Sequence, residues 1–260
     1  MRFLFFFLLS SLISLPAAEW QFTGETDRQQ ITPELVYAKR TAVRTTDGTE
    51  ATALLAFFTS KSFQLEVIDQ GAGPDPAFGT FSQAFRVNGC VAGVNGGFFH
   101  PDYRPLGLMI TGGKRLGSLE TSKLLSGVVF CDAKGIHIVR RAQFKDHPGI
   151  TALLQTGPYL VEAGTTVRGL SASDPRRRTF IATDWRGHWV IGATLSSLTL
   201  ADLGECLGSS GCLTGWKIDR AINLDGGSST GFYLDRGAGN APATIIPWKR
   251  VRNLLGIVPR

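Results

Sequence analysis

Short runs of apolar, β-branched and aromatic residues recur along the chain, and glycine or turn-forming polar residues bound most of them. Such runs predict β-strands. They lie at residues 35–43, 52–58, 63–68, 91–94, 127–130, 136–139, 179–183, 189–193, 221–224 and 231–234. The turns at 132–135 and 184–187 place glycine where a hairpin needs a positive φ, so neighbouring strands are expected to pair antiparallel.

Helical periodicity is confined to two short segments. The leucines of residues 198–208 fall on one face, and Thr199 with Asp202 three residues later resembles a capping box. A second short helix is expected over residues 80–87. Because strands outnumber helices and do not alternate with them, the pattern predicts a single α+β domain with a mixed, largely antiparallel β-sheet core and a few helices.

The first 18 residues have the layout of a secretory signal peptide. Arg2 is followed by an apolar run from residue 3 to 15 and then by Pro-Ala-Ala. A run of about 13 residues is shorter than the roughly 20 that a spanning helix needs. We therefore expect cleavage after residue 18 and a secreted or periplasmic product without a membrane span.

The charge balance is basic, with 27 Lys and Arg residues against 21 Asp and Glu residues and a net charge of +6. This balance favours anionic partners such as phosphates, acidic glycans or membrane surfaces. Motifs of nucleic-acid modules are not evident, and export argues against such a partner. No oligomeric state follows from the sequence.

Four cysteines in an exported protein allow disulfides. Cys206 and Cys212 flank a short flexible loop and are the favoured pair, while Cys90 with Cys131 is a further pairing and four buried thiols are the alternative. There is no C-x-x-C and no histidine beside either pair, so we expect no metal site.

Two polar positions stand beside glycines where apolar strands end. Asn95 precedes Gly96 and Gly97, and this glycine pair lets backbone N–H groups approach a ligand closely. Gln155 follows an apolar run and comes just before a Gly-Pro turn. Either segment alone also fits an ordinary strand-ending turn.

The segment 221–229 is harder to explain as scaffold. Asn223 and Asp225 are two apart, so a strand places both side chains on one face, and Gly226, Gly227 and Ser228 follow at once. A carboxylate held at a strand end beside a loop of small residues is well placed for catalysis.

Three arginines at 176–178 precede an apolar strand that ends at Asp184. Guanidinium groups bind phosphate and carboxylate oxygens in pairs, so Arg177 and Arg178 are candidate anion ligands. A basic run is also typical of a solvated strand edge.

Residues 227–231 also match G-x-S-x-G, the nucleophile elbow of serine hydrolases. That elbow needs a following helix and a histidine later in the chain. The next residues favour a strand, and the last histidine, His188, lies upstream. The serine-hydrolase hypothesis is therefore weak.

Six motifs in this order resemble the phosphodiester glycosidase family. They are NGGFF (95–99), PLGLMITGGK (105–114), QTGPYLVEAG (155–164), RRTFIATD (177–184), LTLADLGECLG (198–208) and AINLDGGSS (221–229). The resemblance implies a catalytic core over residues 90–260, with residues 19–89 as variable N-terminal strands of the same domain. It also implies cleavage of a sugar-1-phosphodiester into a sugar and a phosphomonoester, without a cofactor.

The resemblance assigns site roles to particular positions. Asp225, Asp184 and Arg178 are the expected catalytic residues. The expected substrate-binding residues are Asn95, Gly96, Gly97, Gln155, Arg177, Asn223, Gly226, Gly227 and Ser228. Ser228 stands where the family usually has a third glycine, and Thr156 stands where serine is common; either difference bears on substrate fit.

The chemistry of glycoside cleavage agrees with these roles. Asp225 would stabilise an oxocarbenium-like transition state, by attack or by activating water. Arg178 would bind the phosphate, and Asp184 would orient Arg178 or serve as a second carboxylate. The substrate is expected to be a cell-envelope or exopolysaccharide-type glycan. A non-catalytic envelope protein that binds phosphorylated glycans is the alternative.

Overall fold

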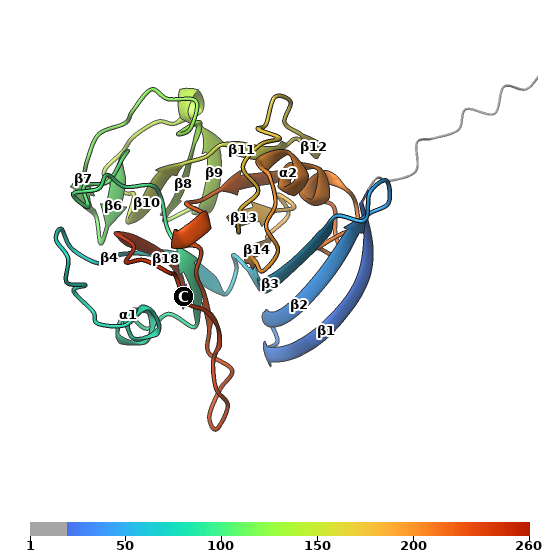
Figure 1. Ribbon diagram of the computed structural model, residues 1–260. Coiled ribbons are helices and arrows are strands. Elements are labelled where there is room, and N and C mark those ends of the chain that lie inside the picture. Colours follow the sequence, from blue (N-terminus) through green and yellow to red (C-terminus); the bar gives the residue numbers. More distant parts are fainter. Residues whose placement is uncertain (1–19) are drawn as a thin grey trace, which may run out of the picture.

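The computed structural model describes residues 20–260, in which the strands form three antiparallel sheets (Figure 1). The expected signal peptide lies outside the described residues. The largest sheet has the order β1 (Trp20–Thr32), β2 (Leu35–Arg44), β3 (Glu50–Thr59), β14 (His188–Thr194), β13 (Thr179–Thr183), β15 (Arg220–Asn223), β11 (Tyr159–Glu162) and β12 (Thr165–Thr166).

Two five-stranded sheets complete the described fold. One has the order β7 (Lys114–Leu116), β6 (Met109–Thr111), β10 (Ala152–Thr156), β8 (Gly127–Asp132) and β9 (Gly135–Arg140). The other has the order β17 (Ala243–Ile245), β16 (Phe232–Leu234), β5 (Ala92–Asn95), β18 (Asn253–Pro259) and β4 (Phe63–Asp69).

Helices contribute little to the described chain. They are α1 (Phe81–Val87), α2 (Leu200–Gly208) and two single-turn 3₁₀ helices, η1 (Arg141–Gln143) and η2 (Gly227–Ser229). Thr199 and Asp202 form the expected capping box at the start of α2. The expected largely antiparallel sheet core with a few helices is confirmed, but the structure is mostly β rather than a balanced α+β fold, because both α-helices are short and cover only part of the sheet surface.

The main hydrophobic core is shared by all three sheets. It joins residues such as Ile181 of β13, Leu154 of β10 and Val94 of β5. Separate clusters lie under α2, on the outer face of the large sheet, and under α1, where the Phe85 and Tyr233 rings stack. Burial on this scale holds the ends of β5, β13 and β15 in fixed relative positions.

Both expected hairpins are present, as β8–β9 and β13–β14. The thirteen-residue strand β1 escaped prediction because its sequence is polar, it lies at the sheet edge, and most of its side chains are partly or fully exposed. β3 pairs with β14, so the strands that precede residue 89 share a sheet with the strands that carry the later motifs.

The cysteines are all free and buried in the structure. Cys206 Sγ and Cys212 Sγ lie 3.1 Å apart as a hydrogen-bonded pair of thiols, where a disulfide was expected. The further pairing of Cys90 with Cys131 is wrong. These two thiols belong to different hydrophobic clusters, and each donates to a nearby backbone carbonyl.

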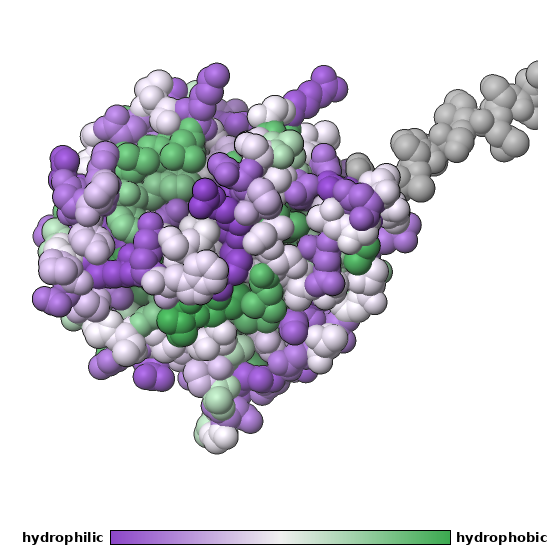
Figure 2. Space-filling view, in the orientation of Figure 1, coloured by the Kyte–Doolittle hydropathy of each residue, from purple (hydrophilic) through white to green (hydrophobic). Residues whose placement is uncertain are grey.

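The face seen in Figure 2 is mainly hydrophilic, with hydrophobic areas between the polar side chains. Over residues 20–260, no helix has the length and apolar content needed to cross a membrane. The same residues contain no cluster of three or more His, Cys, Asp or Glu side chains that could hold a metal ion.

Candidate active site

The ends of β5 and β15 meet at Asp225. The Asp225 N–H donates to the Gly96 carbonyl at 3.0 Å, and Asn95 Nδ2 donates to the Asp225 carbonyl at 2.6 Å. The Gly96 N–H in turn donates to the Asn253 carbonyl at the start of β18. The two glycine-containing motifs, 130 residues apart in sequence, thus form one hydrogen-bonded unit.

Asn95 is the centre of this unit. Its buried Oδ1 accepts from Thr179 Oγ1 at 2.7 Å and from the Gly231 N–H at 2.9 Å. With the bond from its Nδ2 to Asp225, the side chain ties β5, β13 and both sides of η2 together. Asn95 therefore positions the Asp225 backbone and does not offer a free group to a substrate.

Replacing Asn95 with Ala should destabilise the protein by about 2 kcal/mol or more, because it leaves buried donors and an acceptor without partners. Chemical denaturation gives the free energy of unfolding directly. Thr23→Ala is the matched control, since the Thr23 hydroxyl makes a single exposed hydrogen bond on β1. A free energy of unfolding equal to that of the control would contradict the role of Asn95.

Two glycines are required by close contacts. A Cβ on Gly96 would lie 2.0 Å from Asn253 Oδ1, which accepts the Gly97 N–H. Gly227, with φ +61°, begins η2 and donates its N–H to the Arg177 carbonyl at 2.8 Å. A larger side chain at either position would displace the loop that follows Asp225.

Asp225 has an unusual electrostatic setting. Its partial burial raises the pKa of its carboxyl group. Three weaker influences act in the opposite sense: the Ser229 hydroxyl, the Lys249 charge and the Gly226 N–H, which donates to Asp225 Oδ1 at 2.9 Å. A carboxyl group with a raised pKa beside a cation is typical of catalytic sites.

Lys249 is the site residue that the sequence motifs did not reveal. The N–H groups of Trp248 and Lys249 both donate to the Ser228 carbonyl, which holds their segment against the loop that follows Asp225. The Lys249 ammonium lies 5.1 Å from the centre of the Phe99 ring. The only sequence signal was an isolated Pro-Trp-Lys-Arg run outside every strand and motif identified.

Arg178, the expected phosphate ligand, makes no ion pair with Asp225 among the described residues. Arg178 Nε donates to the Leu198 carbonyl at 2.7 Å and its Nη2 to the Asp174 carbonyl at 2.8 Å. The charges that act on Arg178 are those of Arg176, Asp174 and Asp202. Arg178 thus braces the outer face of the sheet, and the cation that acts on Asp225 is Lys249.

Arg177 lies on the opposite side of its strand from Arg178. Its guanidinium carbon is 4.2 Å from the centre of the Trp248 ring. Its Nε and Nη2 are buried and have no hydrogen-bond partner among the described residues. Burial without a partner lowers the pKa of Arg177.

Asp184 is not part of this group. In the register of β13 with β15, Thr183 pairs with Arg220, whereas Phe180 pairs with Asn223. Asp184 therefore lies beyond the far end of β13 from Arg178, where it contacts His188 Nδ1 at 2.6 Å. The expected orientation of Arg178 by Asp184 is thus absent.

Gln155 and Asn223 are buried near the site and hold its backbone. Gln155 accepts from the N–H groups of Leu108 and Glu120 and donates to the carbonyls of Glu120 and Leu125. Asn223 Nδ2 donates to the Gly157 carbonyl, while its Oδ1 is buried without a partner. Gln155 and Asn223 are therefore positioning residues.

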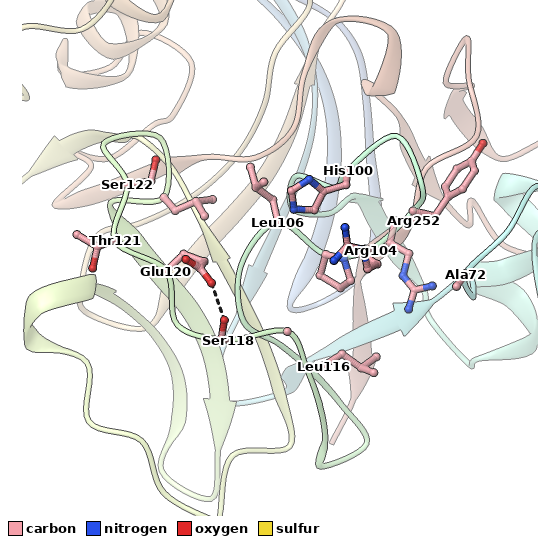
Figure 3. Close-up of a pocket in the computed structure, with 14 residues that line it drawn as sticks. Ala72, His100, Arg104, Leu106, Leu116, Ser118, Glu120, Thr121, Ser122 and Arg252 are labelled. Atoms are coloured by element: carbon pink, nitrogen blue, oxygen red, sulfur yellow. Dashed lines mark hydrogen bonds between the residues drawn. The ribbon is translucent and has the colours of Figure 1, made fainter.

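A cavity of about 620 Å³ adjoins the site. Figure 3 shows Glu120, Thr121 and Ser122 along one side and His100, Arg104 and Arg252 along the other. Two chain segments run from the site to the cavity, since His100 follows the Gly96–Gly97 turn and Arg252 precedes Asn253. Its lining carries both charges and several hydroxyl groups.

Aromatic rings lie between this cavity and Lys249. Tyr103, which lines the cavity, stacks on Phe99 with ring centres 5.8 Å apart. Phe99 in turn lies under the Lys249 ammonium. Two ring contacts therefore connect the cavity lining at Tyr103 with Lys249.

The serine-hydrolase alternative finds no support in this geometry. Gly227–Ser229 is a 3₁₀ turn that leads into strand β16 rather than into a helix. Ser229, the central serine of the motif, is buried and has no histidine partner among the described residues.

Comparison with known proteins places these features in a family. The catalytic domain of zebrafish N-acetylglucosamine-1-phosphodiester alpha-N-acetylglucosaminidase, auto-inhibited by its pro-peptide, has a TM-score of 0.62 and 15% identity, over 93% of this chain and 89% of that chain. A hypothetical protein from Synechocystis has a TM-score of 0.60 and 15% identity, over 92% and 64%. These likenesses show a shared fold.

A search of curated proteins finds no match. The family model for phosphodiester glycosidase matches residues 88–258, which include every motif described above. The chain belongs to the phosphodiester glycosidase family, a family of hydrolases that act on glycosyl bonds.

Proposed function

We propose that this chain hydrolyses sugar-1-phosphodiesters at the bond between the anomeric carbon and the phosphate oxygen. Water supplies the hydroxyl of the released sugar and the proton of the phosphomonoester. The observation that carries the proposal is Asp225, a carboxyl group with a raised pKa that is held at the end of β15 beside Lys249.

Asp225 would act on the sugar side of the scissile bond. Its carboxylate stabilises the oxocarbenium-like transition state, by attack on the anomeric carbon or by activation of water. A second carboxylate as general acid is less necessary than in ordinary glycosidases, because a phosphodiester is already a good leaving group. Among the described residues, no other acid contributes to the pKa shift of Asp225.

The leaving phosphate would lie on the Lys249 side. Negative charge grows on its oxygen atoms as the glycosyl bond breaks, and a fixed ammonium group stabilises that charge more in the transition state than in the substrate. The N–H groups of Gly96, Gly97, Gly226 and Gly227 already donate within the protein, so they are not counted as donors to this phosphate.

The 620 Å³ cavity is the proposed site for the sugar. Hydroxyl groups of Ser118, Thr121 and Ser122, together with Glu120 and His100, provide the donors and acceptors that a sugar ring needs. Gln155 supports this assignment, because its side chain fixes the Glu120 backbone on the cavity wall.

The proposal is tested by incubating purified protein with a panel of UDP-sugars and methyl-phospho-sugars and measuring the free sugar released. Release of sugar by the wild type, absent in Asp225→Asn, supports a glycosidase. Tight binding of these compounds without turnover would instead support a non-catalytic protein that binds phosphorylated glycans.

We further propose export of this activity to a secreted or periplasmic location, with a cell-envelope or exopolysaccharide-type glycan as substrate. The signal-like layout of residues 1–18 and the basic charge balance support this proposal. Fractionation of the source cells and amino-terminal sequencing should find the protein outside the cytoplasm, with a first residue near Glu19. An intact terminus in the cytoplasmic fraction would contradict it.

In an oxidising compartment, the adjacent thiols of Cys206 and Cys212 are expected to form a disulfide. The bridge would close a loop of about seven residues and stabilise the protein by roughly 2–3 kcal/mol on the chain-entropy model. Diamide should therefore raise the melting temperature of the wild type, and peptide mapping should find the Cys206–Cys212 link. Cys90→Ser is the control, and an equal diamide effect in Cys212→Ser would refute the bridge.

A further inference from the structure

Trp248 is the most exposed large hydrophobic side chain among the described residues, at 78% of its full surface. It stands next to Lys249, in the segment that the Ser228 carbonyl holds beside the loop following Asp225. An indole left in water at the edge of an active site is a common sign of a contact surface.

One face of the indole is already supported. The Arg177 guanidinium lies over it at 4.2 Å from the ring centre, in a cation–π arrangement that fixes the orientation of the ring. The Trp248 backbone N–H is also committed, to Ser228. The ring is thus a rigid platform, and its 78% exposure leaves the remaining surface open to a ligand.

The surroundings of the platform are basic. It is flanked in sequence or in space by Arg176, Arg177, Lys249 and Arg250. The acidic residue Asp174 makes a 3.7 Å ion pair with the exposed Arg176. Arg177 Nε and Nη2 lack hydrogen-bond partners among the described residues. An aromatic platform bordered by guanidinium and ammonium groups fits a ligand that carries both a sugar ring and a phosphate.

A groove of about 300 Å³ adjoins the platform. It is lined by Trp248, Lys249 and Arg250 together with Ile246, Pro247 and Phe81. Tyr103 of the 620 Å³ cavity contacts Arg250 of the groove, so the groove and the cavity are neighbours.

We propose that Trp248 binds a second sugar ring, on the phosphate side of the scissile bond. On this assignment, which rests on the proposed function, the substrate is a chain of sugars joined by phosphodiesters. One sugar occupies the cavity, the scissile phosphate meets Lys249, and the sugar that carries this phosphate stacks on Trp248. The following phosphate of the chain lies near Arg177. Trp248 is thus a specificity residue for the length of the substrate.

The test compares two substrates that differ only in the group attached to the phosphate. One is a methyl-phospho-sugar, and the other carries a second sugar in place of the methyl group. Trp248→Ala should lower kcat/KM for the two-sugar substrate by about five- to tenfold and leave that for the methyl substrate within about twofold. Trp248→Phe should restore part of the loss.

Trp185→Ala is the matched control. Trp185 is also exposed and lies under a guanidinium, that of Arg220 at 3.9 Å, but it stands in the β13–β14 turn beyond the far end of β13. Trp185→Ala should leave kcat/KM unchanged for both substrates. Equal losses on the two substrates in Trp248→Ala, or equal losses in both tryptophan variants, would overturn the proposal.

Binding titrations separate this inference from the proposed function. If the wild type cleaves neither substrate, the proposed function fails, but the affinity for the two-sugar ligand still shows whether Trp248 contacts the second sugar. Weaker binding of that ligand by Trp248→Ala supports the contact. Unchanged affinity, or an equal loss of affinity for a single-stranded oligonucleotide of the same charge, contradicts it.

Discussion

Asp225→Asn should lower kcat on sugar-1-phosphodiesters by at least about 10²-fold, and up to about 10⁴-fold, because it removes the carboxylate that acts at the anomeric carbon. The replacement is nearly isosteric and keeps the hydrogen bonds of the Asp225 backbone to Gly96 and Asn95. Initial rates at saturating substrate, measured beside a thermal melt, separate lost chemistry from lost folding.

The same variant should melt at an equal or higher temperature at neutral pH. Burial raises the pKa of Asp225, so the folded state binds this proton more tightly than the unfolded state. The stability from this group is present at low pH and is lost as the pH rises through the raised pKa. At neutral pH the charged carboxylate therefore costs stability, which Asn recovers.

Near-normal turnover in a well-folded Asp225→Asn variant would exclude Asp225 as the essential carboxylate.

Lys249→Met should lower kcat/KM by about 10²–10³-fold, because it removes the cation that faces the leaving phosphate. It should also move the acid limb of the pH–rate profile. Lys249 lowers the pKa of Asp225, so its removal raises that pKa and the activity should begin to fall at a higher pH as the solution is acidified. The pH dependence of kcat/KM measures both effects.

Lys145→Met is the control for the loss of one positive charge, since Lys145 is an exposed residue two positions after the end of η1. It should leave the rate and the pH profile unchanged. A Lys249 variant with a lower rate but an unshifted acid limb would place Lys249 on the phosphate without any influence on Asp225.

Much of the fold was predictable from local pattern. The residues of β13 alternate between two buried faces, and their β-branched and aromatic character defined the strand at its true ends. The capping box of α2 was also readable, because Thr199 and Asp202 have the chemistry and spacing that the first turn requires. The edge strand β1 was not, because polar residues with little burial carry no hydrophobic signal.

The polar core of the site was predictable because its residues are local to their motifs. Asn95 and Asp225 each stand at a strand end beside glycines, and the structure joins them directly. Which of the neighbouring arginines, Arg177 or Arg178, lies on the Asp225 side of the chain was not predictable. Arg177 and Arg178 point to opposite faces of the chain, and only the packing of the sheets decides which face adjoins Asp225.

Lys249 and Trp248 could not be found from spacing. They belong to a segment without a strand or motif of its own, and backbone hydrogen bonds to Ser228 bring it to the site. The position of Asp184 outside the site was likewise not predictable from its motif. The length and register of β13 place Asp184 and Arg178 beyond opposite ends of this strand.

The central claim is cleavage of the bond between the anomeric carbon and the phosphate oxygen, and isotopic labelling of the solvent tests it most directly. The wild-type protein is incubated with a methyl-phospho-sugar in water enriched in ¹⁸O, and the phosphomonoester is analysed by mass spectrometry. A glycosidase leaves the phosphate oxygen atoms unlabelled and places the solvent oxygen in the released sugar. Incorporation of ¹⁸O into the phosphate would show attack on phosphorus and would contradict the account.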